Sequence, residues 1–365
     1  MKKILTVLGA RPQFIKASVV SHAISQTPNL TEVLVHTGQH FDADMSDVFF
    51  DELGMEKPTH NLDINGGNHG EMTGRMLIAL ERVALKEKPD VMLVYGDTNS
   101  TIAGALVAAK LHIPVAHVEA GLRSFNMRMP EEINRILTDR VSAWLFTPTD
   151  AATLNLRNEG VPAERIIQVG DVMYDVALQH GARVSESGGV LQRLGFKPRS
   201  YILTTIHRAE NTDDPQRLTA IVNALCETAR QTPVVWPLHP RTRNILNQLG
   251  LMDRACAELC LIDPVGYLDM VQLEKYALLI ATDSGGVQKE AFFHRVPCVT
   301  LRDETEWIEL VDAGWNRLAD ARSADSLGVG IAAAFACTRK DVQPYGSGTA
   351  AEEIVATLIK DLVAM

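Results

Sequence analysis

Short apolar runs alternate with helix-like segments along nearly the whole of this 365-residue chain, and this alternation limits the folds that it can adopt. Such a pattern is typical of parallel strands joined by crossover helices. The sequence therefore predicts an α/β fold. The runs that we expect to be strands are residues 4–8, 33–35, 91–95, 115–118, 144–147, 166–169, 201–206, 234–237, 259–262, 278–282 and 298–301.

The chain is longer than a single hydrophobic core usually supports, so two domains are expected. A polar, glycine-containing stretch at residues 181–200 separates two series of predicted strands, and we place the boundary between Gly170 and Gly189. This predicts an N-terminal domain of residues 1–172 and a C-terminal domain of residues 173–348. The last predicted helix, residues 349–364, follows a Pro-Tyr-Gly-Ser-Gly breaker and could pack on either domain.

Charge and composition exclude several classes of protein. With 35 Lys and Arg against 45 Asp and Glu, the net charge of −10 argues against a surface for nucleic acid or an anionic membrane. The apolar run at residues 4–8 is too short for a signal peptide or a membrane span, so we expect a cytoplasmic protein. Five cysteines without a C-x-x-C pair indicate reduced, structural thiols.

Two predicted strand ends carry residues suited to an anion. After the first strand, Gly9, Arg11, Pro12 and Lys16 surround the start of a helix, where backbone N–H groups favour negative charge. The alternative is a solvated basic first turn. His207 stands beside a second cation, Arg208, at the end of another strand.

A glycine turn follows Asp283, and it has two readings. Gly285 and Gly286 allow close backbone approach, and Ser284 can cap the next helix, so a phosphate could bind to the free N–H groups. The alternative is a capped strand-to-helix turn without a ligand. The chain has neither a Walker loop nor a G-x-G-x-x-G motif after a strand, so a nicotinamide cofactor is not expected.

Carboxylates are a sharper signal. Asp97 and Glu119 end two predicted strands, and Glu131 opens a helix, so the three could converge on one side of a cleft. Glu131 could instead serve only the helix dipole. His36 and His40 straddle a glycine and could be ligands or turn residues. Neither H-E-x-x-H nor G-x-S-x-G is present, which argues against a catalytic metal and against an α/β hydrolase.

Taken together, these motifs resemble the non-hydrolysing UDP-N-acetylglucosamine 2-epimerases over nearly the whole chain. The motifs are residues 9–12 with Lys16, residues 36–40, 96–98, 117–123 and 130–132, His207 and Arg208 with Glu210 and Asn211, residues 283–288 with Glu290, and residues 302–306. The resemblance implies two Rossmann-like domains of the glycosyltransferase-B type with an interdomain cleft, the final helix (349–365) returning to the N-terminal domain. It also implies a homodimeric bacterial isomerase of polysaccharide biosynthesis, such as lipopolysaccharide O antigen synthesis, that needs no metal or cofactor.

The resemblance also assigns residues to roles in epimerisation at C2 by UDP elimination and re-addition through a glycal. The catalytic residues it implies are Asp97, Glu119, Glu131, His207 and Lys16. Those it implies for binding the UDP-sugar are Arg11, Arg208, Ser284, Gly285, Gly286, Glu290 and Arg302. A second, allosteric UDP-sugar site would involve Gln39, His40 and Arg75. Spacing does not reveal which acid removes the C2 proton.

Two departures from the family pattern bear on the substrate. Residues 306–309 read Glu-Trp-Ile-Glu where the family often has Glu-Arg-Pro-Glu, and the loop before Pro130 looks shorter. Residues 11–16 and 121–126 are more similar to the branch acting on UDP-2,3-diacetamido-2,3-dideoxyglucuronic acid, and Arg123 or Arg128 could pair with its carboxylate. The alternatives are a hydrolysing 2-epimerase, a UDP-sugar glycosyltransferase and a non-catalytic nucleotide sensor.

Overall fold

A computed structural model describes residues 1–39 and 47–364, which fold into two compact units. Unit 1 comprises Met1–Val176 and Gln343–Met365, and unit 2 comprises Ala177–Val342. The chain leaves unit 1 within helix α7 (Val172–Arg183) and returns to it after Val342. Within the described residues, no helix combines the length and the apolar character needed to span a membrane.

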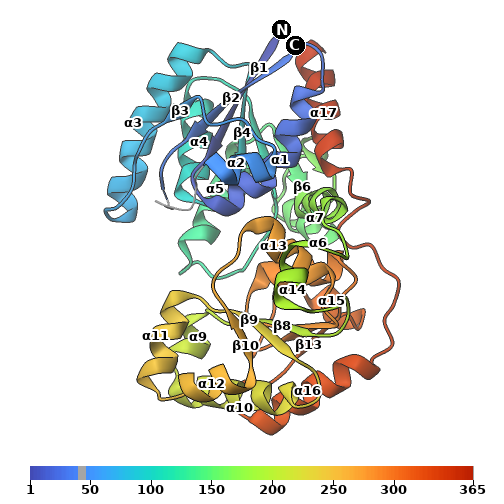
Figure 1. Cartoon of the computed structure of the whole chain (residues 1–365). Coiled ribbons are helices and arrows are strands. Elements are labelled where there is room, and N and C mark those ends of the chain that lie inside the picture. Colours follow the sequence, from blue (N-terminus) through green and yellow to red (C-terminus); the bar gives the residue numbers. More distant parts are fainter. Residues whose placement is uncertain (40–46, 365) are drawn as a thin grey trace. The chain divides into compact units, whose positions relative to one another are not determined.

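Unit 1 is built on a seven-stranded, wholly parallel sheet in the order β3-β2-β1-β4-β5-β6-β7 (Figure 1). Its strands are β1 (Lys2–Leu8), β2 (Leu30–His36), β3 (His60–Asn61), β4 (Val91–Tyr95), β5 (Val115–Val118), β6 (Trp144–Thr147) and β7 (Ile166–Gln168). Besides the start of α7, its helices are α1 (Arg11–Ser25), α2 (Asp47–Leu53), α3 (His69–Glu87), α4 (Asn99–Lys110), α5 (Pro130–Val141), α6 (Asp150–Asn158), the 3₁₀ turn Ala163–Arg165 and α17 (Ala350–Ala364).

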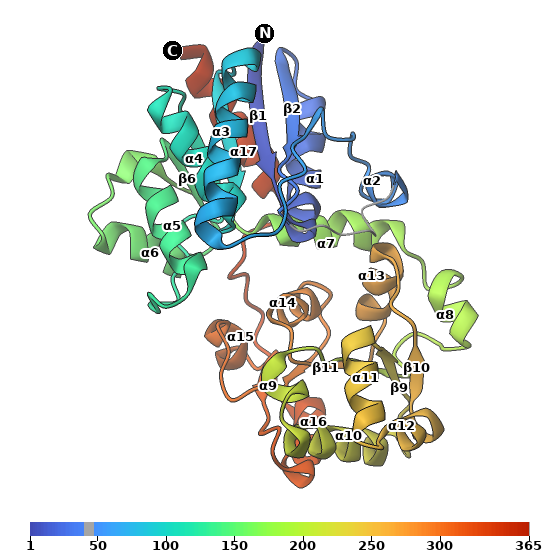
Figure 2. The same ribbon diagram turned by 90° about the vertical axis from the view of Figure 1, so that its left-hand side faces the viewer.

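Helices cover both faces of the unit 1 sheet. Leu5 and Val7 of β1 point to one face and pack with buried residues of α3 and α4, such as Met76. On the opposite face α1 lies against α17, so the two ends of the chain meet in one unit (Figures 1 and 2). A strand buried on both faces explains why β1 reads as a continuous apolar run rather than as an alternating one.

Unit 2 contains a six-stranded parallel sheet in the order β10-β9-β8-β11-β12-β13. Its strands are β8 (Ile202–Thr205), β9 (Val234–Pro237), β10 (Cys260–Ile262), β11 (Leu279–Thr282), β12 (Cys298–Thr300) and β13 (Asn316–Leu318). Its helices, after the end of α7, are α8 (Gly189–Leu194), α9 (Ala209–Thr212), α10 (Pro215–Ala229), α11 (Pro240–Gln248), α12 (Met252–Glu258), α13 (Tyr267–Lys275), α14 (Gly285–Phe293), α15 (Ile308–Asp312) and α16 (Ala324–Ala336).

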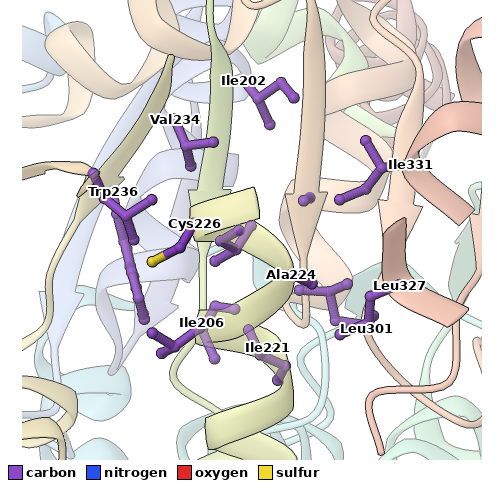
Figure 3. Close-up of a cluster of buried hydrophobic side chains, with 14 of the residues drawn as sticks. Ile202, Ile206, Ile221, Ala224, Cys226, Val234, Trp236, Leu301, Leu327 and Ile331 are labelled. Carbon is purple, nitrogen blue, oxygen red and sulfur yellow. The ribbon is translucent and has the colours of Figure 1, made fainter. Parts of the chain in front are cut away.

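The core of unit 2 has one layer on each side of the sheet. Side chains of α10, α12 and α16 pack on one face, and Figure 3 shows Cys226 of α10 near Val234 and Trp236, which both belong to β9. Side chains of α8, α13 and α14 pack on the other face, around Leu203 and Ile280. Each unit therefore has a hydrophobic core of its own.

The predicted α/β fold is confirmed, and each of the eleven predicted strands is present with differences only at its ends. The prediction missed β3 and β13, two very short strands, each at one edge of its sheet. An edge strand has one neighbour and needs little apolar sequence, so its pattern is weak.

Both sheets reverse their direction of growth at one place. The chain builds outward from β1 through β3 and then returns to add β4 on the other side of β1, and β8 and β11 are related in the same way. In open parallel sheets, ligands bind outside the carboxyl ends of the strands at this switch point. The ends of β1 and β4 in unit 1, and of β8 and β11 in unit 2, are therefore the places to look for a site.

Candidate active site

The switch point of unit 1 is held tightly by Gln13. Its side-chain oxygen accepts from the N–H of Gly9, at 2.8 Å, and its amide nitrogen donates to the carbonyl of Tyr95, at 2.7 Å. Gly9 has no room for a side chain, because a Cβ there would lie 1.9 Å from Oγ of Ser100. The beginning of α1 is thereby fixed against the ends of both central strands.

Lys16 and Glu119 form an ion pair near the carboxyl ends of the central strands, with Nζ 2.5 Å from Oε2. The side chain of Glu119 is 5% exposed and that of Lys16 is 21% exposed. Burial alone would lower the pKa of Lys16, but Glu119, followed by Asp97 and Asp171, outweighs burial and raises it. Lys16 therefore stays positively charged among three acids.

The backbone at Glu119 is strained. Its φ of +69° lies in the left-handed region, which a residue with a Cβ adopts only when its surroundings hold it there. Gly96 adopts a φ of +63°, and a Cβ on it would lie 3.3 Å from Oε2 of Glu119. The carboxylate of Glu119 thus lies directly beside Gly96, the residue before Asp97.

Asp97 is fixed by two neighbours on α5. Nη2 of Arg135 lies 2.5 Å from Oδ2 of Asp97, and the side chain of Asn134 donates to its carbonyl at 2.8 Å. The other side of the Arg135 guanidinium binds Glu132, at 2.9 Å. Arg135 therefore joins the partly exposed carboxylate of Asp97 to the buried one of Glu132.

Glu132 anchors this arrangement. It is 1% exposed, and it accepts hydrogen bonds from the backbone N–H groups of Ser124 and Phe125, at 2.8 and 2.9 Å. Burial would raise the pKa of Glu132, but these two bonds and the ion pair with Arg135 lower it. The loop before α5 is thus tied to the residue that holds Asp97.

Glu131 differs from the other two acids. It is exposed in the first turn of α5, and its side chain makes no hydrogen bond or ion pair with another described residue. It lies four residues before Arg135, a spacing that places both on one side of the helix. Its carboxylate is therefore available to a ligand, although the structure does not fix its position through a partner.

The suggestion that Arg123 pairs with a substrate carboxylate is wrong. Its side chain is 1% exposed and is bound to Asp139 at 2.8 Å and to Glu159 at 2.7 Å. Asp139 also binds Nδ1 of His117, whose Nε2 reaches the carbonyl of Gly96 at 2.8 Å. Arg123 is therefore part of a buried network that supports the strand ends, while Arg128 is exposed.

In unit 2, Asp283 organises the switch point. It is completely buried and accepts hydrogen bonds from the backbone N–H groups of His207 and Arg208 and from the side chain of Asn211. These bonds connect the end of β11 to the segment that follows β8. The imidazole of His207 remains half exposed, with Nδ1 3.7 Å from Asp283, which is too long for a hydrogen bond.

Ser284 caps α14, as predicted, with its Oγ facing the N–H of Val287 at 3.5 Å. Gly285 and Gly286 open the helix, where backbone N–H groups have no acceptor within the helix. A Cβ on Gly285 would lie 3.8 Å from Nη2 of Arg208. A glycine turn with an arginine beside it has the chemistry of an anion site.

Two predicted binding residues of unit 2 lie near this turn. Arg302 is buried and forms a bidentate pair with Glu306, at 2.9 and 3.1 Å, while its Nε has no partner among the described residues. Glu290 lies one turn along α14 from Gly286. Burial raises the pKa of Glu274 well above its usual value, and the charge of Glu290 adds to this effect.

The remaining predicted residues lie in unit 1. Arg11 is the first residue of α1, next to Ala10. Gln39 accepts from the N–H and the hydroxyl of Ser100, at 2.9 and 2.8 Å, whereas Arg75 donates to the carbonyls of Asn65 and Gly66. Gln39 and Arg75 thus have separate partners, and His40 lies outside the described residues.

Sequence reasoning missed Arg135, Glu132 and Asp171. The signal for Arg135 was its spacing of four residues from Glu131, whereas the link from Glu132 to the loop at residues 124–125 depends on tertiary structure. Among the described residues there is no group of three or more His, Cys, Asp or Glu side chains that could hold a metal ion. What the two units present is an acid cluster around one lysine and a glycine turn flanked by cations.

Comparison with known proteins shows the family of the chain. The family described as UDP-N-acetylglucosamine 2-epimerase matches residues 22–359. The chain is similar to a Pseudomonas aeruginosa UDP-2,3-diacetamido-2,3-dideoxy-D-glucuronate 2-epimerase, with 58% identity covering 98% of this chain and 99% of that protein.

Solved structures agree. The crystal structure of Methanocaldococcus jannaschii UDP-GlcNAc 2-epimerase in complex with UDP-GlcNAc and UDP matches with a TM-score of 0.85 and 44% identity, covering 99% of this chain and 100% of that chain. The Neisseria meningitidis enzyme bound to UDP-GlcNAc matches with a TM-score of 0.83 and 30% identity, over 98% and 100% of the two chains. Because these similarities extend through both units, they confirm the predicted resemblance, and the chain belongs to the UDP-N-acetylglucosamine 2-epimerase family.

Proposed function

We propose that this chain inverts C2 of a UDP-activated 2-acetamido sugar and returns it as the UDP-sugar, without releasing free sugar. The observation that carries the proposal is the cluster of Lys16, Asp97 and Glu119 at the switch point of unit 1. A nucleotide sensor has no use for two acids around a lysine, one of them buried and on a strained backbone, and a glycosyltransferase needs fewer acids.

The difficulty of the reaction is that no carbonyl group acidifies the hydrogen on C2. We propose that the C1–O bond breaks first and its electron pair leaves with UDP. A carboxylate then takes the C2 proton, and the electrons of the C2–H bond form the double bond of a glycal. A proton delivered to the opposite face of C2, together with re-formation of the C1–O bond, gives the epimer. Asp97, Glu119 and Glu131 supply these proton transfers.

The cations and the glycine turn have a separate task in this proposal. Negative charge grows on the diphosphate as UDP leaves, and preorganised donors stabilise it. We assign this task to the N–H groups of Ser284, Gly285 and Gly286, with Arg208, His207, Arg302 and Arg11, and we assign the ribose hydroxyls to Glu290. Lys16 balances the negative charge of the acids near the sugar.

We propose the diacetamido-uronate sugar as the preferred substrate, because the P. aeruginosa relative with 58% identity is named for it. Arg128 is the residue to test, since it is exposed on the loop that Glu132 ties down. The Arg128→Met variant should lower kcat/KM for the diacetamido-uronate about tenfold or more and leave that for UDP-GlcNAc almost unchanged. Equal losses with both substrates would remove Arg128 from substrate selection.

The reaction itself is tested in deuterated water. The purified protein is incubated with UDP-GlcNAc and, separately, with the diacetamido-uronate, and the products are followed by NMR. We expect a UDP-linked epimer that carries deuterium at C2. Free sugar would instead select a hydrolysing epimerase, turnover only with an added acceptor would select a transferase, and binding without turnover would select a sensor.

We further propose a homodimer. Four large apolar side chains are exposed on neighbouring parts of unit 1, Ile78 and Leu85 on α3 and Ile133 and Leu137 on α5, and α4 lies between these helices. Light scattering should give twice the chain mass, and Leu85→Glu should reduce it to that of a monomer. We place the enzyme in the cytoplasm, supplying activated sugars for a surface polysaccharide such as the lipopolysaccharide O antigen.

A further inference from the structure

Trp307 lies against the glycine turn of unit 2. Its indole N–H donates to the carbonyl of Gly285, at 2.8 Å, and Nζ of Lys289 lies 4.5 Å from the centre of its ring. The hydroxyl of Thr305 donates to the side chain of Gln288, at 2.6 Å. The segment before α15 is therefore attached to the first two turns of α14 at three points.

The hydrogen bond from Trp307 to the carbonyl of Gly285 also affects the orientation of the next N–H group, that of Gly286. The C=O of Gly285 and the N–H of Gly286 belong to one planar trans peptide and point in opposite directions. This peptide is the first of α14, and two successive glycines have unusual backbone freedom, so the helix alone holds it less firmly than it would hold other residues. By fixing the carbonyl, the indole also fixes the direction of the Gly286 N–H at the start of α14.

Charged groups surround the same turn. A Cβ on Gly285 would lie 3.7 Å from Nε1 of Trp307 and 3.8 Å from both Nη2 of Arg208 and Oε2 of Glu306. Burial would raise the pKa of Glu306, but the hydrogen bonds and charge of Arg302, together with Arg208, lower it. Glu306 therefore stays ionised and paired with Arg302, while the indole is bonded to the backbone of Gly285.

We infer that Trp307 is a positioning residue for the diphosphate of the UDP-sugar: it orients the Gly285–Gly286 peptide so that the Gly286 N–H is ready to bind a phosphate oxygen. The inference rests on the proposed function and adds to it a residue that does not itself touch the ligand. The sequence suggested that position 307 affects sugar identity, whereas these contacts connect it to the nucleotide half of the substrate.

Trp307→Phe is the direct test, because phenylalanine keeps an aromatic ring near Lys289 but has no N–H. Trp315→Phe is a matched control, since the indole of Trp315 also donates to a backbone carbonyl in unit 2, that of Lys340, at 2.9 Å. We expect the Kd for UDP, measured by calorimetry, to rise about 5–10-fold in Trp307→Phe, the loss typical of one hydrogen bond. It should change less than about twofold in Trp315→Phe.

Two further readouts separate positioning from a general loss of structure. The thermal unfolding temperature of Trp307→Phe should stay near that of the wild type, while kcat falls along with UDP affinity, because the peptide also stabilises the departing diphosphate. UDP should also change the tryptophan fluorescence of the wild type and of Trp315→Phe, but much less that of Trp307→Phe.

The outcomes also separate this inference from the function on which it rests. A wild-type protein that neither binds UDP nor epimerises a UDP-sugar would overturn both. A wild type that does both, with Trp307→Phe equal to it in UDP affinity and in fluorescence response, would overturn only the role of Trp307. A Trp307→Phe variant that loses UDP affinity only as far as it loses thermal stability would overturn that role as well.

Discussion

Arg135 connects two carboxylates with different surroundings. Glu132 is buried and receives two backbone hydrogen bonds, whereas Asp97 is more exposed and depends on Arg135 and Asn134 for its orientation. A positional error of about 1 Å at a reacting group can cost about 10²-fold in rate. The position of the Asp97 carboxylate therefore depends on Arg135, a residue to which we assign no proton transfer.

Arg135→Met should lower kcat about 10²-fold, because Asp97 loses its partner and Glu132 is left with an unpaired buried charge. The Kd for UDP should hardly change, since Arg135 is not among the residues that we assign to the nucleotide. Arg140→Met, on the exposed side of the same helix, is the control and should keep near wild-type kinetics. Steady-state kinetics and UDP calorimetry on both variants test this, and equal kcat values would contradict it.

The three acids can be tested individually. Asp97→Asn, Glu119→Gln and Glu131→Gln preserve shape while removing the group that exchanges a proton, so each should lower kcat by about 10²–10⁴-fold. Hydrogen-to-deuterium exchange at C2 of the recovered substrate identifies the base, because the variant that lacks the base for that isomer loses exchange entirely. Near-normal turnover in all three variants would disprove the elimination mechanism proposed here.

Arg123 and Arg128 belong to one loop but should respond differently to the same substitution. Arg123→Met leaves Asp139 buried without its guanidinium partner, and breaking a buried pair typically costs about 3–5 kcal/mol of stability. Arg128→Met removes an exposed side chain and should change stability by less than about 0.5 kcal/mol. Urea unfolding of the two variants measures the difference, and similar free energies of unfolding would contradict the burial of Arg123.

At the scale of elements, α7 and α17 are joined by a carboxylate. Oδ2 of Asp175 accepts from the N–H of Ala351 at 2.7 Å, at the start of α17. Burial raises the pKa of Asp175 to about 6, even though the N–H groups of Ala351 and Ala350 oppose the change. The folded chain therefore holds this proton more tightly than the unfolded chain, for which the pKa is 3.8.

This difference has a defined sign. Between pH 4 and pH 6 the folded state carries more protons on Asp175 than the unfolded state, so its contribution to the free energy of unfolding falls as the pH rises, by about 3 kcal/mol in total. The amide introduced by Asp175→Asn cannot ionise. The stability of the variant relative to wild type should therefore increase from pH 4 to pH 7, and a constant difference in urea unfolding would contradict the prediction.

The sequence could predict the features that depend on neighbouring residues in the chain, but not those that depend on contacts between distant residues. The central strands are continuous apolar runs, and the turns after β1, β4 and β11 carry glycines and acids, so strands and strand-end residues were predictable. Arg123 binds Asp139, Arg135 binds Asp97 and Trp307 binds Gly285 across 16 or more residues, and no local pattern encodes these contacts. Whether an arginine faces a ligand or the interior was therefore decided by tertiary structure.

For the whole molecule, two separate hydrophobic cores imply that a core substitution in one unit destabilises that unit and not the other. Leu5 belongs to the core of unit 1 and Leu203 to that of unit 2, and both are fully buried. Replacing either by alanine should cost about 2–5 kcal/mol. In hydrogen exchange followed by mass spectrometry, Leu5→Ala should weaken protection in β1, β2 and β4, and Leu203→Ala in β8, β9 and β11. Loss of protection in both units from one substitution would show that they unfold together.

The return of α17 to unit 1 also sets an order of events during synthesis. Unit 2 is one continuous stretch of chain, whereas unit 1 lacks Ile354, Leu358 and the other buried residues of α17 until that helix, which follows unit 2, is made. On the ribosome, unit 2 can form its hydrophobic core while the side of α1 that packs against α17 is still exposed to solvent. Unit 1, which holds the acids, is thus completed after unit 2, and a nascent chain that stops before α17 would leave the apolar side of α1 exposed to solvent.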